Sequence, residues 1–255
     1  MAVVETEKRE HVFIITLNRP EARNAINGDV AEGIEAAIDA FEADDDLWVG
    51  IIASSGKVFC AGADLKAISS GDAGRLSTKR GGFAGIVKRE RTKPLIAAVN
   101  GAAVAGGCEI VLASDMVVAA EEAVFGVPEV KRSLVPAAGG LFRLPRAVGP
   151  AVGMELMLTG DPITAQRAHD LGLVNYVVAQ ADLMDKALEL AGRITANAPL
   201  AVQRAMQITK RAMVDSDEEL WKASTDAMRY LGGTEDFKEG PRAFIEKRAP
   251  VWKAK

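Results

Sequence analysis

Two glutamates are the residues of this chain whose type and setting are best suited to chemistry. Glu109 lies in the first turn of an expected apolar helix, and Glu129 follows the Phe-Gly-Val-Pro run at residues 125–128. Two carboxyl groups close together in a dry cleft repel each other, which raises one pKa so that one group can give a proton while the other takes one. Each glutamate alone also has a simpler structural explanation, as a helix start stabilised by the helix dipole or as a polar turn.

Two turns rich in glycine and alanine accompany the glutamates. Residues 60–66 (CAGADLK) open a short helix, and residues 99–109 (VNGAAVAGGCE) run from a strand into the helix that carries Glu109. The first N–H groups of a helix have no internal acceptor, so both turns offer outward-pointing amides, in the second turn at Gly106 and Gly107. Two such amides can hold one carbonyl oxygen as it becomes an oxyanion, which contributes roughly 3 to 4 kcal/mol per donor. Glycine before a helix is also a common packing device, so neither turn alone establishes a site.

Other catalytic motifs are excluded by their spacing. Residues 54–57 (SSGK) follow an expected strand, but Gly50 stands one position too early for a phosphate loop and Val58 replaces the required serine or threonine. Residues 101–107 lack the GxGxxG spacing of a dinucleotide site. A serine nucleophile is not supported, because the chain has no G-x-S-x-G elbow and no credible histidine base.

The elements that must position these residues alternate between strands and helices. Apolar, β-branched runs predict strands at residues 11–17, 48–53, 95–99 and 116–119. Apolar residues at helical spacing predict a helix over residues 28–43, with Asn27 as its cap. The alternation predicts an α/β fold. Residues 69–85 shift to glycine, serine and charge, and we expect a mobile loop over a site there.

The last third of the chain is predicted to be helical. Strands end near Tyr176, and helices are expected at residues 181–197, 199–214, 217–231 and 240–247. We therefore expect an α/β core over residues 1–175 and a C-terminal helical region over residues 176–255. Alanine-rich helices with apolar faces serve either as an oligomer interface or as a structural cap, and the sequence leaves both open.

Composition excludes several classes of function. The 255 residues are 49% hydrophobic, enough for one large domain with a real core. A net charge of −4, from 31 basic and 35 acidic residues, argues against nucleic acid as a partner. No apolar run reaches the roughly 18 to 20 residues that span a bilayer, and the N-terminus lacks a signal-peptide stretch, so we expect no membrane association and a cytoplasmic protein. Cys60 and Cys108 are far apart and have no histidine neighbours, so we expect no metal site and no disulfide.

Taken in order, these segments resemble the crotonase, or enoyl-CoA hydratase, superfamily over nearly the whole chain. The matching segments are Asn18-Arg19-Pro20 with Asn24-Ala25, then residues 61–66, 93–109, 125–129, 136–140, 143–144 and 160–175. Each motif is modest, but their order and spacing together are very specific. The resemblance implies a spiral of β-β-α units that binds acyl-CoA, followed by a C-terminal helical region that serves oligomerisation and covers the active site.

The resemblance also implies the site residues. The oxyanion-hole amides fall on Ala63 and Gly106, and the two hydratase carboxylates fall on Glu109 and Glu129. The substrate-binding residues fall on Ala61, Asp64, Leu65, Lys66, Gly107, Phe244 and Lys247, of which the last two reach the CoA of a neighbouring subunit. The expected assembly is a homotrimer or a dimer of trimers. No metal or redox cofactor is implied, because the thioester of the acyl-CoA substrate itself accumulates the charge.

The implied reaction is the addition of water across the 2,3-bond of an enoyl-CoA, because enoyl isomerases of the superfamily often keep only one of the two glutamates. Glu109 is expected to activate water and Glu129 to protonate C2. Residues 81–85 and the tail at 246–253 are similar to the carnitinyl-CoA dehydratase branch, which is one alternative; an enoyl isomerase and an inert acyl-CoA-binding oligomer are the others. Ala105, Ser133 and the pair at residues 141–142 depart from the commonest family pattern and concern the acyl pocket.

Overall fold

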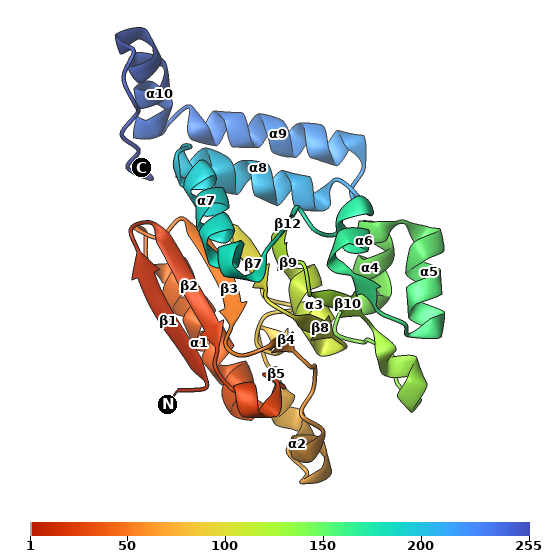
Figure 1. Cartoon of the computed structure of the whole chain (residues 1–255). Coiled ribbons are helices and arrows are strands. Elements are labelled where there is room, and N and C mark those ends of the chain that lie inside the picture. Colours follow the sequence, from red (N-terminus) through yellow and green to blue (C-terminus); the bar gives the residue numbers. More distant parts are fainter. Residues whose placement is uncertain (1) are drawn as a thin grey trace.

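A computed structural model describes residues 2–255, and its largest element is a six-stranded sheet (Figure 1). The strand order is β1 (Val4–Arg9), β2 (Val12–Leu17), β3 (Val49–Ser54), β7 (Leu95–Val99), β9 (Met116–Ala120) and β12 (Tyr176–Val178). Strand β1 is antiparallel to β2, and all other neighbours in this sheet are parallel. The central strands β3 and β7 are almost completely buried, as parallel strands are when helices cover both faces.

A smaller sheet packs beside the large one. Its strand order is β11 (Ile163–Thr164), β10 (Val124–Gly126), β8 (Ala102–Val104) and β4 (Val58–Cys60). A two-stranded pair, β5 (Ser77–Thr78) and β6 (Gly82–Phe83), lies in the loop that follows β4. The chain passes three times from a strand of the large sheet to a strand of the small sheet and then into a helical segment. This repeated path confirms the predicted spiral of β-β-α units.

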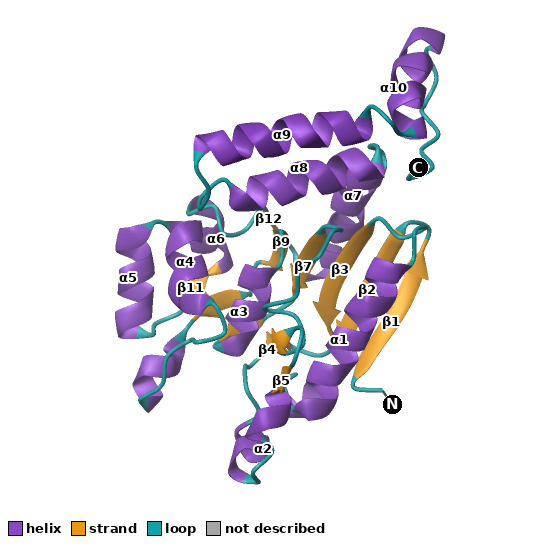
Figure 2. Ribbon diagram, turned by 180° about the vertical axis from the view of Figure 1, so that it is seen from behind, coloured by secondary structure: helices purple, strands orange, loops and turns teal. Residues whose placement is uncertain are grey.

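Helices cover both faces of the large sheet. Helix α1 (Gly28–Ala43) lies on one face and α7 (Leu183–Thr195) on the other, as the two opposite views show (Figures 1 and 2). The α1 bounds match the prediction, and Asn27 caps the helix by accepting the amide of Val30 at 3.0 Å. The remaining helices are α2 (Leu65–Ser69), α3 (Gly106–Ala113), α4 (Gly140–Val148), α5 (Pro150–Thr159), α6 (Ala165–Asp170), α8 (Pro199–Arg211), α9 (Asp217–Leu231) and α10 (Glu235–Glu246).

The predicted strands of the large sheet lie within one residue of the observed β2, β3, β7 and β9. Strand β1 was not predicted, because five of its six residues are exposed and polar, and its one strand neighbour among the described residues is β2. Strand β12 and helix α7 lie beyond residue 175, yet both pack with the large sheet. The expected helix at residues 240–247 begins earlier, at Glu235, because Thr234 caps it through the amide of Phe237.

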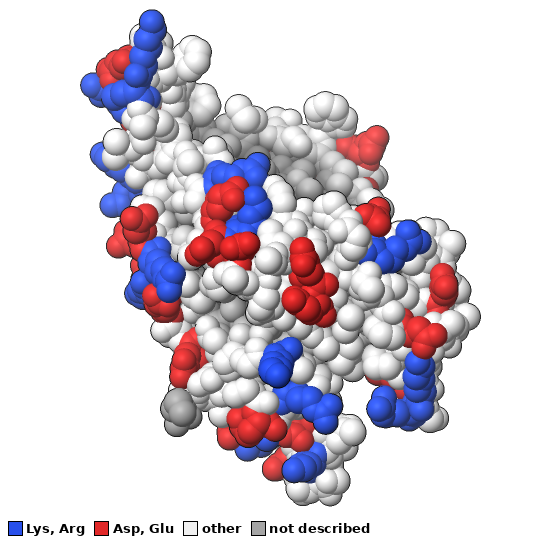
Figure 3. Space-filling view, in the orientation of Figure 1, with Lys and Arg blue, Asp and Glu red and all other residues white. Residues whose placement is uncertain are grey.

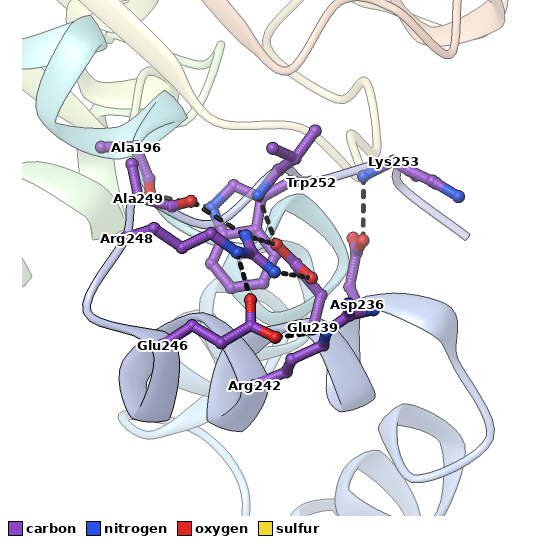
Figure 4. A network of polar contacts seen from close by, with 10 residues as sticks. Ala196, Asp236, Glu239, Arg242, Glu246, Arg248, Ala249, Trp252 and Lys253 are labelled. Atoms are coloured by element: carbon purple, nitrogen blue, oxygen red, sulfur yellow. Dashed lines mark hydrogen bonds and ion pairs between the residues drawn. The ribbon is translucent and has the colours of Figure 1, made fainter.

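Helix α10 and the tail that follows it form a C-terminal hairpin, residues 235–255, which projects from the body of the protein (Figures 1 and 4). The buried carboxylate of Asp236 accepts the amides of Lys253 at 2.8 Å and Ala254 at 3.1 Å. Arg248 forms ion pairs with carboxylates of α10, and the indole Nε1 of Trp252 donates to the carbonyl oxygen of Ala196 at 2.9 Å. These contacts fold the tail back along α10 and tie the hairpin to the end of α7.

The surface carries both signs of charge in small groups, as the face in Figure 3 shows, with no extended region of a single sign on that face. Many of these groups are ion pairs between neighbouring elements, such as Arg75 with Asp29 at 2.8 Å. Within residues 2–255, none of the helices combines the length and the apolar character needed to cross a bilayer.

Candidate active site

The ends of three neighbouring parallel strands position the site. Strands β4, β8 and β10 lie side by side in the small sheet, with Phe125 opposite Ala103 and Cys60 opposite Ala103 on the other side. Because the strands are parallel, their carboxyl ends meet at one edge of the sheet. The segments that leave this edge carry Ala63 after β4, Gly106 and Glu109 after β8, and Glu129 after β10.

Glu109 lies in the first turn of α3, as predicted, and is only 3% exposed. Its Oε1 accepts the amide of Gly140, the first residue of α4, at 2.9 Å. Burial raises the pKa of Glu109 to about 7; the amide of Gly140 opposes the shift and the charge of Glu129 adds to it. The carboxyl group of Glu109 in the unliganded protein is therefore mostly protonated below pH 7 and mostly ionised above it.

Glu129 lies in the 3₁₀ turn Pro128–Arg132 that follows β10. Burial raises its pKa as well, against the opposing effects of its own backbone amide and of the Arg132 guanidinium. Its Oε2 atom is buried and has no hydrogen-bond partner among residues 2–255. Buried carboxylate oxygens are normally paired, so this unpaired atom adds to the cost of ionising Glu129. Both glutamates line the same cavity.

The amide of Ala63 is turned away from its own strand. Ile26 donates its amide to the carbonyl oxygen of Gly62 at 2.8 Å, and its carbonyl oxygen accepts the amide of Asp64 at 2.9 Å. Ala63 lies between these two bonds, opposite Ile26 in a parallel bridge. In a parallel ladder the N–H of such a residue faces the other side, and Ala63 lines the cavity.

The turn of Ala63 touches the turn of Gly106. A Cβ atom on Gly62 would lie 3.0 Å from the backbone nitrogen of Gly106, so glycine at 62 allows the close approach. The amide of Gly106 donates to no acceptor within residues 2–255. Between β8 and α3, Ala105 adopts φ 52° and ψ −129°, a strained conformation for alanine that redirects the chain so that α3 begins beside the turn. Ala63 and Gly106 therefore line one cavity, and the amide of neither donates to an acceptor within residues 2–255.

The cavity has a volume of about 1100 Å³ and lies between the two turns and the segments 77–88 and 128–138. Its walls hold the predicted residues Ala61, Ala63, Asp64, Leu65, Lys66, Gly106, Glu109 and Glu129. The loop expected to cover a site also contributes, through residues 77–83. Basic side chains on the walls are Arg19, Arg23, Lys66, Lys79, Lys88 and Arg132. The cavity thus joins a cationic wall to the carboxyl groups of the buried Glu109 and the half-buried Glu129.

Three residues predicted to bind substrate lie elsewhere. Gly107 lies outside the cavity lining, and a Cβ there would approach the carbonyl oxygen of Cys60 to 2.1 Å, so its glycine allows α3 to pack on β4. Phe244 and Lys247 lie on the projecting C-terminal hairpin, with Phe244 85% exposed. Neither lines the cavity of its own chain, so any role they have in binding requires a second subunit.

Three contributors to the site were not found from the sequence. The amide of Gly140 binds Glu109, and the signal for it was a second glycine pair, residues 139–140, at a helix start. Arg143 donates to the carbonyl oxygen of Val87 at 2.7 Å, and its positive charge lowers the pKa of Glu109. The ring of Phe83 lies where a Cβ on Gly106 would come within 2.4 Å of it, and it lines the cavity. No local pattern identified the last two.

The fold and the cavity together define a protein of crotonase type, an α/β spiral with paired carboxyl groups at the ends of its smaller sheet. The family model for enoyl-CoA hydratase/isomerase matches residues 7–255, and the chain belongs to this family. The predicted superfamily is therefore confirmed, and with it an enzyme.

Individual relatives span the full length of the chain. It is 42% identical to an enoyl-CoA hydratase of Mycobacterium tuberculosis, over 98% of both proteins, and 42% identical to a carnitinyl-CoA dehydratase of Salmonella typhi, over 96% of this chain and 95% of the relative. The crystal structure of an enoyl-CoA hydratase from Mycobacterium tuberculosis matches it with a TM-score of 0.96 at 43% identity, covering 100% of both chains. The names of these relatives support a hydro-lyase and leave the acyl group of the substrate open.

Proposed function

We propose that this protein catalyses the reversible addition of water to a 2,3-enoyl-CoA thioester. The observation that carries the proposal is that the buried Glu109, the half-buried Glu129 and two amides without an acceptor in residues 2–255, those of Ala63 and Gly106, belong to residues lining one cavity. Preorganised amides of this kind stabilise negative charge on a carbonyl oxygen, and carboxyl groups with raised pKa values transfer protons near neutral pH.

The proposed mechanism begins with the thioester carbonyl oxygen between the amides of Ala63 and Gly106. These donors draw electron density toward the oxygen and leave C3 electrophilic. Glu109 takes a proton from a water molecule as the water oxygen bonds to C3, and Glu129 gives a proton to C2, which yields the 3-hydroxyacyl-CoA. The two glutamates exchange protons with solvent to reset the site. Dehydration is the same sequence reversed, and no metal or redox cofactor takes part, because the thioester carries the developing charge.

The environment of Glu109 fits this role. A general base works best when its pKa lies near the operating pH, and burial raises the pKa of Glu109 to about 7. The amide of Gly140 holds Oε1 at 2.9 Å and so fixes the orientation of the carboxyl group. Oε2 of Glu129 is buried without a partner among residues 2–255, which disfavours the ionised form and suits a group that must hold a proton for C2.

The lining of the cavity favours an uncharged acyl chain. Phe83, Val87, Leu134 and Val135 form an apolar part of the wall, while the basic side chains suit the phosphates of CoA. Besides Glu109 and Glu129, the lining carboxylates are Glu21 and Asp64, and Asp64 is paired with Arg19 at 2.6 Å. A trimethylammonium group would therefore find little anionic support in the cavity.

Carnitinyl-CoA dehydration is the second candidate, because a relative of that name is as similar in identity as the enoyl-CoA hydratase. Both reactions would use the same amides and glutamates. An enoyl isomerase is less favoured, since both hydratase glutamates are present and line the cavity. We further propose that the enzyme works in the cytoplasm as a homotrimer or a dimer of trimers, with Phe244 and Lys247 of one subunit at the CoA of its neighbour.

Assays with a set of CoA thioesters distinguish between these proposed functions. Hydration of crotonyl-CoA removes its conjugated absorbance, and we expect wild-type protein to do so while Glu109→Gln and Glu129→Gln lose at least about 100-fold in kcat. A panel of longer enoyl-CoAs and crotonobetainyl-CoA identifies the acyl group. If the protein binds CoA esters but leaves every absorbance unchanged, or if both glutamine variants keep full turnover, the proposal is wrong and an inert acyl-CoA-binding oligomer remains.

A further inference from the structure

The turn that carries Ala63 lacks hydrophobic anchoring on its C-terminal side. It leads into α2, a five-residue helix none of whose residues is buried, and Leu65 at its start is 60% exposed. An amide that must point at a reacting oxygen needs a fixed orientation, because a shift of about 1 Å can reduce a rate by roughly 100-fold. Polar contacts must therefore supply most of the restraint on this side.

Those contacts converge on Asp64 and Arg19. Oδ2 of Asp64 accepts Nη1 of Arg19 at 2.6 Å, and the same nitrogen donates to the carbonyl oxygen of Ala25 at 3.1 Å. Oδ1 of Asp64 accepts the amide of Lys66 at 2.9 Å and so caps α2. The side chains of Arg19 and Asp64 are 21% and 10% exposed, so the pair is better shielded from solvent than an ordinary surface ion pair.

These contacts hold the residues on both sides of Ala63. On one side the backbone of Ile26 holds Gly62 and Asp64, and on the other Arg19 holds the Asp64 side chain to Ala25, the residue before Ile26. The contact also neutralises Asp64, whose negative charge would otherwise lie next to the amide that stabilises the oxyanion. Burial alone would raise the pKa of Asp64, but the bonds from Arg19 and the α2 amides outweigh it and lower the pKa.

We propose that Arg19 is a positioning residue for the reaction: through Asp64 it fixes the Ala63 amide in the direction of the thioester oxygen. The inference rests on the proposed function, since it assigns that amide to the oxyanion hole. A competing role is direct binding of a CoA phosphate, because Arg19 lines the cavity. The two roles differ in what they change: loss of a positioning residue lowers kcat, whereas loss of a phosphate contact raises KM.

The test compares Arg19→Met, Asp64→Asn and the double variant in the crotonyl-CoA assay. Asp64→Asn keeps a side-chain oxygen for the α2 cap but removes the charge that Arg19 holds, so it decides the question even where Arg19→Met fails to fold. We expect kcat to fall roughly 10- to 100-fold in each single variant, and the double variant to lose no more than the worse single one, because the pair acts as a unit.

A second, spectroscopic experiment measures the polarisation of the thioester carbonyl directly. The probe is 2,4-hexadienoyl-CoA, a conjugated thioester whose absorbance moves to longer wavelength when its carbonyl oxygen is polarised, and every protein in this experiment carries Glu129→Gln so that the probe is not consumed. We expect Arg19→Met and Asp64→Asn to reduce the shift by at least half. Arg23→Met, which removes a positive charge from the same cavity wall, is expected to raise KM and keep the shift.

Arg75→Met is the matched control for the loss of an arginine–carboxylate contact, since Arg75 pairs with Asp29 and Glu32 away from the cavity. It should change neither kcat nor the shift. Positioning by Arg19 is overturned if Arg19→Met raises KM alone, or if Asp64→Asn keeps both kcat and the shift. If the wild-type protein does not hydrate crotonyl-CoA while the Glu129→Gln protein shifts the probe, the proposed function is overturned and the spectroscopic test of Arg19 stays intact.

Discussion

The buried carboxyl of Glu109 should make the protein less stable at alkaline pH, and Glu109→Gln should reverse this. Burial raises the pKa of Glu109 from its ordinary value of 4.5 to about 7. Between these values the folded chain keeps the proton that the unfolded chain has released, so stability falls as pH rises. The gap is about 2.5 pH units at about 1.4 kcal/mol each, which gives a loss of roughly 3 kcal/mol at pH 8 and less than about 1 kcal/mol at pH 5.

Glutamine keeps the acceptor for the Gly140 amide but has no charge to bury. We therefore expect the variant to gain about 3 kcal/mol over wild type at pH 8, which corresponds to roughly 6–12 °C in Tm for a chain of this size, and much less at pH 5. Thermal unfolding at fixed protein concentration measures both values. Glu122→Gln is the control, since Glu122 is exposed and its side chain makes no hydrogen bond or ion pair within residues 2–255.

The comparison of the two pH values is what tests the reasoning. A variant that is equally stable or less stable than wild type at both pH values would show that Glu109 does not bury a charge at pH 8. A gain of the same size at both would point to improved packing instead of a change in ionisation. Only a gain that grows between pH 5 and pH 8 agrees with a folded-state pKa near 7.

Four further predictions concern the site and its supports. We expect kcat/KM to rise with pH through about 7 as Glu109 loses its proton, and steady-state assays of Glu109→Gln should lack this rise. Gly106→Pro should abolish turnover by removing a donor, with Gly106→Ala, which meets the same Phe83 ring, as the steric control in the assay. Ala105→Gly should raise the unfolding free energy by about 1 kcal/mol by relieving the positive φ, as denaturant unfolding would show. Asp236→Ala should destabilise the C-terminal hairpin by about 1–3 kcal/mol, seen as faster hydrogen exchange at residues 253–254.

The sequence predicts the large sheet well and the small sheet poorly, for a physical reason. Strands β3 and β7 are continuous apolar runs because helices cover both of their faces. Strands β4, β8 and β10 have only three residues each, which is too short for a period of two to distinguish them from turns. Their pairing arises from the spiral path of the chain, which local sequence does not encode.

The site also has features that the sequence predicts and features that it does not. The small residues of the turns and the position of Glu109 in a first helical turn are local features, and the sequence indicates them correctly. The contacts that tune them join residues far apart in the chain: Gly140 lies 31 positions from Glu109, and Asp64 lies 45 positions from Arg19. Such contacts depend on which elements are neighbours in space, and a single sequence carries no signal of that.

The spiral also accounts for how ordinary features become a site. A helical segment starting after a strand offers unpaired amides in any α/β protein, and a carboxyl group near such a start is common. Here three successive units place their starts at the ends of adjacent parallel strands, so Ala63, Gly106 with Glu109, and Glu129 reach one cavity from three separate places in the chain. The repeated units bring these residues to one cavity. The contacts of Gly140 with Glu109 and of Arg19 with Asp64 then hold the carboxyl group and the turn of Ala63 in place. Changes at the carboxyl ends of β4, β8 and β10 should therefore affect turnover before stability, whereas changes within β3 or β7 should do the reverse.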